Sequence, residues 1–148
     1  MNHKQLAQEY FKRGYNCAQS VVMAFCDQTG ITEEEGAKLA SSFGGGLGRM
    51  REVCGAVSGM AIVAGMLFGY ADPKVPGAVQ QHYALVQQLA GKFKEKNGSI
   101  ICRELLGDHS PIRSAPDPRT PEYYKKRPCV ELVGDAAEIL DEYLKTKE

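Results

Sequence analysis

The sequence has no excess of charge of either sign, because 18 basic residues balance 18 acidic ones over 148 residues. Without a net field there is no general attraction to nucleic acid or to an anionic membrane, so we expect neither as a partner. The N-terminal residues also lack an apolar run of signal-peptide length, which favours a cytoplasmic location. The uncharged stretch 53–71 contains four glycines, and no second candidate span exists, so we expect no membrane insertion.

Strand alternation and internal repeats are also missing, whereas helical periodicity recurs along most of the chain. No polar linker separates two halves, so we expect one all-α domain over residues 1–148, a compact multi-helix bundle around a central apolar helix at 54–69. Clustered prolines predict an extended, irregular strap over 111–128, before the last helix. The other predicted helices cover about residues 3–13, 17–30, 32–43, 76–97, 100–106 and 129–144.

The five cysteines contain no CxxC pair, so a thioredoxin-type centre and a zinc ribbon are not indicated. An odd number of thiols in a reducing compartment favours redox groups or metal ligands over a structural disulfide framework. Cys26 lies nine positions after Cys17 in the same predicted helix and therefore on its opposite face. We interpret Cys26 as a small buried apolar residue. The other four are the candidate catalytic and metal-ligating residues: Cys17, Cys54, Cys102 and Cys129.

These four cysteines share one position, the N-terminus of a predicted helix. Unpaired backbone N–H groups and the positive end of the helix dipole favour a thiolate there, and they lower the pKa of a cysteine. The thiolate is the form that attacks disulfides and binds soft metals. The pattern therefore predicts four acidic thiols that converge from distant segments. The alternative is four unrelated cysteines that serve only packing.

A glycine-rich segment, 44–48, precedes Arg49 and Arg51 and lacks the Gly-Lys-Ser/Thr ending of a phosphate-binding P-loop. Its glycines let the backbone approach a bound group closely, with arginine charge nearby. We therefore take Gly45, Gly46, Gly55 and Arg49 as candidate cofactor-binding residues. A flexible connection at 44–48, and close helix packing at Gly55, are the alternatives.

The proline-rich strap is locally basic. Its positive charge could stabilise a thiolate at Cys129 or attract an acidic partner, and a solvated loop is the alternative. The basic residues of the strap are Arg113, Arg119, Lys125, Lys126 and Arg127.

The cysteine segments resemble a known family. The run Cys54–Gly59 matches the CGAxxG motif of the C_GCAxxG_C_C family, which is described as redox-active because of its four cysteines. An NCAQSV segment at 16–21, a GSxxCxELL segment at 98–106 and Cys129 follow the same order as in that family. The resemblance covers nearly the whole chain and leaves Cys26 outside the pattern. It implies a redox role for the four cysteines without naming a substrate.

Three functions remain open from the sequence. The first is thiol–disulfide exchange or electron transfer with an unidentified redox partner, either a protein or a small molecule, in which cysteine pairs lie within disulfide reach. The second is a metalloprotein whose four thiolates hold an iron–sulfur cluster or a structural zinc. The third is a non-catalytic binding or scaffold protein in which the cysteines lie far apart. The apolar helices also make a homodimer an option.

Overall fold

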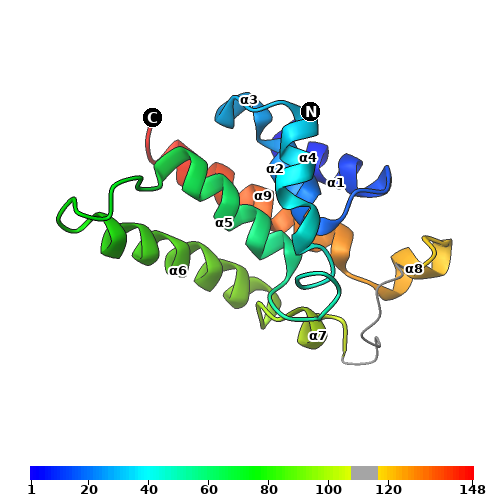
Figure 1. The fold of residues 1–148 in the computed structure, drawn as a ribbon. Coiled ribbons are helices and arrows are strands. Elements are labelled where there is room, and N and C mark those ends of the chain that lie inside the picture. Colours follow the sequence, from blue (N-terminus) through cyan, green and yellow to red (C-terminus); the bar gives the residue numbers. More distant parts are fainter. Residues whose placement is uncertain (108–116) are drawn as a thin grey trace.

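The computed structural model describes residues 1–107 and 117–148, and only the backbone of Lys125 and Lys126 (Figure 1). This part of the chain is helical, as predicted, and its one strand-like feature is a single antiparallel bridge between Val53 and Ile101. The long helices carry most of the core. The elements are α1 (His3–Lys12), α2 (Cys17–Ala24), α3 (Cys26–Thr29), α4 (Glu33–Ala40), the 3-10 turn η1 (Ser41–Phe43), α5 (Gly55–Phe68), α6 (Ala78–Asn97), α7 (Cys102–Leu105), α8 (Pro121–Lys126) and α9 (Cys129–Lys145).

Three of the N-terminal helices begin with a capping box. In each one, a side-chain oxygen of the cap accepts the backbone N–H three residues later, and the side chain of that later residue accepts the backbone N–H of the cap. Two free N–H groups at the helix start are thereby satisfied at once. This local chemistry explains why the starts near Asn16 and Thr32 were predictable from sequence. The three pairs are Asn2 with Gln5, Asn16 with Gln19, and Thr32 with Glu35.

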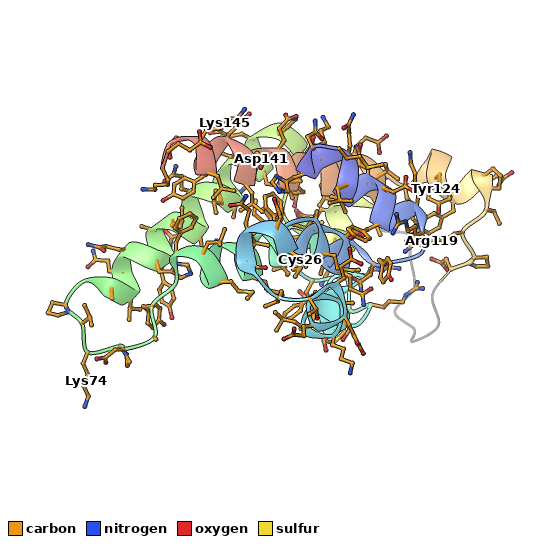
Figure 2. All side chains as sticks on the ribbon, turned by 90° about the horizontal axis from the view of Figure 1, so that it is seen from above. Cys26, Lys74, Arg119, Tyr124, Asp141 and Lys145 are labelled. Atoms are coloured by element: carbon orange, nitrogen blue, oxygen red, sulfur yellow. The ribbon has the colours of Figure 1, made fainter. Side chains whose placement is uncertain are left out.

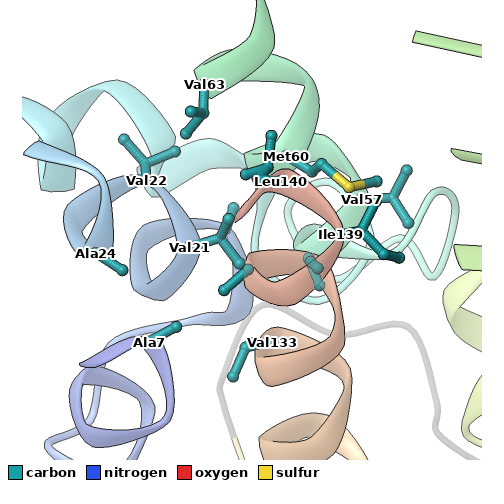
Figure 3. Packing of buried hydrophobic residues seen from close by; sticks show 14 of the residues in the cluster. Ala7, Val21, Val22, Ala24, Val57, Met60, Val63, Val133, Ile139 and Leu140 are labelled. Atoms are coloured by element: carbon teal, nitrogen blue, oxygen red, sulfur yellow. The ribbon is translucent and has the colours of Figure 1, made fainter. Parts of the chain in front are cut away.

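The core forms where α2, α5 and α9 meet, with α1 packed against α2 and α9 (Figure 3). Val21, Val63 and Leu140 contribute fully buried side chains from these three helices. Each such burial contributes about 1.5–3 kcal/mol before conformational entropy is counted. Gly59 allows α5 to lie close to α2, because a Cβ there would stand 2.9 Å from the carbonyl oxygen of Ala18.

Two elements differ from the sequence prediction. The helix expected over 17–30 is interrupted at Phe25, whose φ of −106° and ψ of 16° end α2 and start α3. Phe25 is fully buried and stacks on His3 with 4.1 Å between ring centroids, so tertiary packing decides this break. The strap contains a short helix, α8, because Pro121 occupies its first turn and Thr120 caps it. Residues 111–116 of the strap lie outside the described residues.

The tip of the α5–α6 hairpin, which Lys74 marks, projects beyond the other helices (Figure 2). In the described residues, no helix combines the length and the hydropathy needed to cross a membrane. The opposite end of α5 lies beside the loop 44–54 and α7 (Figure 1). The cysteines of the sequence pattern gather at that end.

Candidate functional site

One cavity of about 550 Å³ is lined by all four cysteines of the sequence pattern. Cys54, Cys102 and Cys129 are buried, and Cys17 keeps some exposed area. Cys26 is not among the lining residues; it is partly exposed beside the carbonyl oxygen of Thr32. The structure therefore brings together the four predicted cysteines and excludes the fifth. The other lining residues are Phe11, Asn16, Ser41, Gly44, Gly45, Gly46, Gly48, Arg49, Arg51, Gly55, Leu105, Leu106, Asp117, Arg119, Tyr123, Arg127 and Leu132.

Cys17 is positioned by its neighbour Asn16. The Asn16 side chain caps α2 through the N–H of Gln19 at 2.8 Å and also donates to the carbonyl of Ser41 at 3.2 Å. This second hydrogen bond ties the start of α2 to the segment that leads into the glycine loop. Gly44 packs directly on Asn16, since a Cβ at Gly44 would stand 2.5 Å from the amide nitrogen of Asn16. The sequence Asn16-Cys17 thus links a helix start to one wall of the cavity.

Cys54 and Cys102 are held by the bridge between two extended segments. The N–H of Cys54 donates to the carbonyl of Ile100 at 2.8 Å, and the N–H of Cys102 donates to that of Glu52 at 2.6 Å. These bonds align 52–54 with 100–102 at the starts of α5 and α7. Two cysteines separated by 48 positions in sequence thereby reach the same cavity.

The loop that precedes Cys54 has a left-handed backbone. Five consecutive residues, 45–49, have positive φ, and Arg51 follows with φ of 61°. Left-handed conformations cost a non-glycine residue about 1–2 kcal/mol, so Leu47, Arg49 and Arg51 store strain. Such strain is typical of functional segments. Gly46 is required for close approach, since a Cβ there would meet the Cβ of Cys102 at 2.7 Å.

Four arginines and one aspartate bring charge to the cavity wall. Arg49 contacts Asp117 at 3.3 Å, and Arg127 also contacts Asp117. Arg119 donates to the backbone carbonyls of Phe11 and Tyr15. Positive charge therefore predominates among the side chains that line the cavity.

Arg51 makes the direct contact with a cysteine. Its Nη1 donates to the Cys102 sulfur at 3.7 Å, although 51 residues separate the two in sequence. Arg51 is only 4% exposed, so this guanidinium is enclosed by protein. Charged groups are seldom buried this deeply unless they are paired or serve a function.

The four thiols differ in acidity. Hydrogen bonding between the Cys17 and Cys129 sulfurs is the largest effect on both: it lowers the pKa of Cys129 and raises that of Cys17 well above 9.0. Arg127, Arg119 and Arg51 lower the pKa of Cys129 further, against the effect of its burial. Cys129 is therefore the thiol that ionises most readily.

Burial raises the pKa of the other two cysteines. It raises that of Cys54 to about 12, although the N–H groups of Ala56 and Val57 oppose the shift. Burial also raises the pKa of Cys102, and the contact with Arg51 opposes it. The prediction that all four thiols are acidic is thus wrong for three of them. For Cys54 and Cys102 the cause is desolvation, which outweighs the effect of the helix N-terminus when the sulfur loses contact with water.

The four residues predicted to bind a cofactor all lie at the cavity. Gly45, Gly46, Gly55 and Arg49 line the cavity, so they lie where a bound group could meet them. Gly55 also packs against the backbone of α2, because a Cβ there would lie 3.1 Å from the Ala18 nitrogen.

The basic strap behaves as expected at two of its positions, Arg119 and Arg127, which act on the pKa of Cys129. Arg113 lies outside the described residues, and so do the side chains of Lys125 and Lys126. Sequence reasoning missed Tyr123, whose ring lies under the guanidinium groups of Arg119 and Arg127 at 5.8 and 4.9 Å. No pattern in the sequence singles out this tyrosine, because its partners lie on both sides of α8.

Metal binding depends on how closely the possible ligand side chains approach one another. In residues 1–107 and 117–148, no three His, Cys, Asp or Glu side chains converge closely enough to hold a metal ion. A structural zinc, which needs four close ligands around one ion, therefore does not fit this arrangement. A cluster of several atoms demands a wider spacing of the four sulfurs than one ion does.

Comparison with known proteins identifies the family. Residues 15–143 match the family described as "Putative redox-active protein (C_GCAxxG_C_C)". The chain belongs to the C_GCAxxG_C_C family. An uncharacterized protein of Archaeoglobus fulgidus is 28% identical over 153 aligned positions, which cover 98% of this chain and 95% of that protein. No solved structure matches. The C_GCAxxG_C_C match includes all four cysteines that line the cavity.

Proposed function

We propose that this protein carries out thiol–disulfide exchange, with Cys129 as the attacking thiol and Cys17 as the resolving thiol. The observation that supports this most directly is the cavity that Cys17 and Cys129 share, where Arg127, Arg119 and Arg51 favour the thiolate form of Cys129. Such a pair is what a two-step exchange needs, because one sulfur attacks as a thiolate and the second follows. Five free cysteines fit a reducing compartment, which is consistent with the cytoplasm.

The exchange takes place in two steps, and each step releases one half of the substrate. The Cys129 thiolate attacks a substrate disulfide, forms a mixed disulfide and releases the first half of the substrate as a thiolate. Cys17 gives its proton to the released thiolate, attacks the Cys129 sulfur and releases the second half of the substrate as a thiolate. The substrate gains two electrons, and the protein is left with a Cys17–Cys129 disulfide. An external dithiol returns the pair to its reduced form.

The test is the reaction of reduced protein with a disulfide, followed by free-thiol counting and peptide mapping. We expect two thiols to be lost, those of Cys17 and Cys129. Cys129→Ser should slow the reaction by about 100-fold or more, because a serine hydroxyl is a poor nucleophile without an activating base. Cys26→Ser is the matched control, since Cys26 lies outside the cavity, and it should react at the wild-type rate. Wild-type protein that loses only Cys26 would contradict the proposal.

A second candidate function is supported by the number of cysteines. Four thiols are the ligand set of an iron–sulfur cluster, and Cys17, Cys54, Cys102 and Cys129 would hold it in the cavity of about 550 Å³. Such a cluster would supply one-electron transfer, and the arginines would offset its negative charge. Anaerobic purification with iron and sulfide analysis separates the two candidates. A brown protein with all four thiols protected from alkylation supports the cluster, and a colourless protein with a reactive Cys129 supports exchange.

A further inference from the structure

We propose that the cysteine cavity binds the oxyanion group of a small aliphatic disulfide or thiol, with the Arg51 guanidinium as the anchor. This inference rests on the proposed function of Cys17 and Cys129 and names the class of substrate for it. The carboxylate or sulfonate end of the ligand meets Arg51, and its sulfur reaches Cys129 in the same cavity.

Arg51 has hydrogen-bonding capacity that the described residues leave unused. Its Nη1 donates to the Cys102 sulfur, whereas its buried Nε and Nη2 have no partner in residues 1–107 and 117–148. A buried guanidinium normally has its N–H groups satisfied, because leaving them unpaired costs free energy. An oxyanion accepts two parallel N–H bonds from such a fork and would recover that cost.

The backbone holds Arg51 in place. Its N–H donates to the carbonyl of Gly45 at 3.1 Å, and its carbonyl accepts from the Nε of Arg103 at 3.1 Å. Its φ of 61° is a conformation that residues other than glycine seldom adopt. A strained backbone that is tied on both sides fixes where the side chain begins. This is the preorganisation that an anchor for a ligand requires.

The remaining charges favour an anion. Asp117 is the one carboxylate among the described lining residues, and it contacts both Arg49 and Arg127. Arg119 donates to two backbone carbonyls, which carry no formal charge. The positive charges of Arg51 and Arg119 are therefore not balanced by a carboxylate contact within the described chain. A ligand with a negative charge would balance the positive charges of these two arginines.

The apolar part of the wall suits a short aliphatic ligand. Phe11, Leu105, Leu106 and Leu132 line the cavity together with the cysteines. Its volume of about 550 Å³ lies within the range of small-molecule sites, roughly 300–1,000 Å³. Two sources fit the shared chemistry: an organic disulfide with terminal carboxylates, or an inorganic sulfur oxyanion such as thiosulfate.

The first arm of the test compares three disulfides of nearly equal length: 3,3′-dithiodipropionate, 2-hydroxyethyl disulfide and cystamine, which end in a carboxylate, a hydroxyl and an ammonium group. Reduced protein is mixed with each one, and loss of the Cys129 thiol is followed in a single turnover. We expect dithiodipropionate to react about tenfold faster than hydroxyethyl disulfide, and cystamine to react slowest. Arg51→Gln should remove most of this preference. The ratio to the neutral disulfide corrects for any change in the reactivity of Cys129.

Arg13→Gln is the matched control, because it removes one positive charge at a residue outside the cavity wall. It should keep the wild-type preference. Arg51→Lys covers the case in which the glutamine variant fails to fold, since lysine keeps the charge but loses the planar fork; it should show a reduced preference. An equal rate for the three disulfides in wild-type protein, or an unchanged preference in Arg51→Lys, overturns the proposal.

The second arm measures binding without exchange. Suberate replaces the two sulfurs of dithiodipropionate by two methylenes, and 1,6-hexanediol is the matched neutral compound. We expect suberate, but not hexanediol, to raise the melting temperature of wild-type protein and of Arg13→Gln, and to do so less in Arg51→Lys. An Arg51-dependent effect of thiosulfate without one of suberate supports the oxyanion site and assigns it to the inorganic source. Suberate binding through Arg51 with no reaction of any disulfide leaves the anion site standing and refutes the exchange function; no stabilisation by either anion refutes the site.

Discussion

The cysteine cavity encloses about 550 Å³, and a second cavity at the hairpin end, between α5, α6 and α9, encloses about 560 Å³. The second one is lined by aromatic residues such as Phe68, Tyr70 and Tyr143, and no cysteine or arginine lines it within the described residues. The first has four thiols and four arginines. Volume therefore does not distinguish the two ends of the molecule, whereas arginine charge and cysteine sulfur do.

The backbone conformation also differs between the cysteine end and the hairpin end of the molecule. The loop at the cysteine end holds Leu47, Arg49 and Arg51, the non-glycine residues with positive φ in the described chain. At the hairpin end, positive φ falls on a glycine, Gly77, which accepts it without cost. Residues with a strained left-handed backbone thus lie beside the cysteines, whereas a glycine takes that conformation at the hairpin. This contrast is typical of a site whose geometry matters more than its stability.

The largest expected effect comes from Gly46→Ala. The new Cβ would lie 2.7 Å from the Glu52 nitrogen and 2.8 Å from the Arg51 Cα, so backbone must move. We expect the free energy of unfolding to fall by roughly 2–4 kcal/mol, from overpacking added to the left-handed cost. Gly48→Ala is the matched control, because its φ is also positive but nothing lies within 4 Å; it should lose about 1 kcal/mol.

Urea denaturation of both variants measures this difference. Gly46→Ala should also shift the reactivity of Cys102 toward alkylating reagents, since the clash includes its Cβ. Equal losses of stability in the two alanine variants would show that the packing between the loop 44–51 and α7 is not as described.

An intermediate effect is expected from Cys17→Ala on the acidity of Cys129. Hydrogen bonding from Cys17 is the largest cause of the lowered pKa of Cys129, so its removal should move that pKa upward, toward 9.0. Because the thiolate is the reactive form, alkylation of Cys129 rises with pH and reaches half of its maximum below pH 9.0 in wild-type protein. The midpoint should shift to higher pH in Cys17→Ala.

The measurement is the pH profile of iodoacetamide alkylation, with each site resolved by mass spectrometry. Cys26 provides the internal comparison, since burial raises its pKa and its midpoint should lie above 9.0 in both proteins. The sign for stability follows from linkage: the folded state releases the Cys129 proton at lower pH than the unfolded chain, so this group stabilises the fold increasingly as pH rises toward 9.0. An unchanged midpoint in Cys17→Ala would rule out the pairing of the two sulfurs.

The smallest expected effect contrasts the two loops directly. Leu47 is 41% exposed with φ of 69°, so Leu47→Gly should stabilise the protein by about 0.5–1 kcal/mol through relief of left-handed strain. Val75, in the hairpin loop, is 51% exposed and has no positive φ. Val75→Gly should instead lose about 0.5–1 kcal/mol, because glycine has more conformational freedom in the unfolded chain. Thermal unfolding of the Leu47→Gly and Val75→Gly variants measures both changes in stability. A destabilised Leu47→Gly variant would show that the loop 44–51 is not strained.

Much of the fold could be predicted because its determinants are local. Asn16 and Thr32 indicate helix starts through pairs of capping residues three positions apart, and Gly98 indicates the end of α6. The break at Phe25 could not be predicted in this way, since it depends on the distant ring of His3. The helix α8 was also missed, because a proline cluster predicts irregular structure unless one proline occupies the first turn of a helix.

The sequence by itself determined which four cysteines belong together and that they begin helices, because the motifs and the helix caps are each formed by residues close together in the sequence. Only the tertiary structure decided which thiol is acidic. A helix start acts on its own cysteine over one turn, whereas desolvation, a neighbouring sulfur and arginine charge come from other segments and act through space. The pKa of Cys129 is lowered because Cys17, Arg127 and Arg119 act on it through space, and that of Cys54 is raised because the fold buries it.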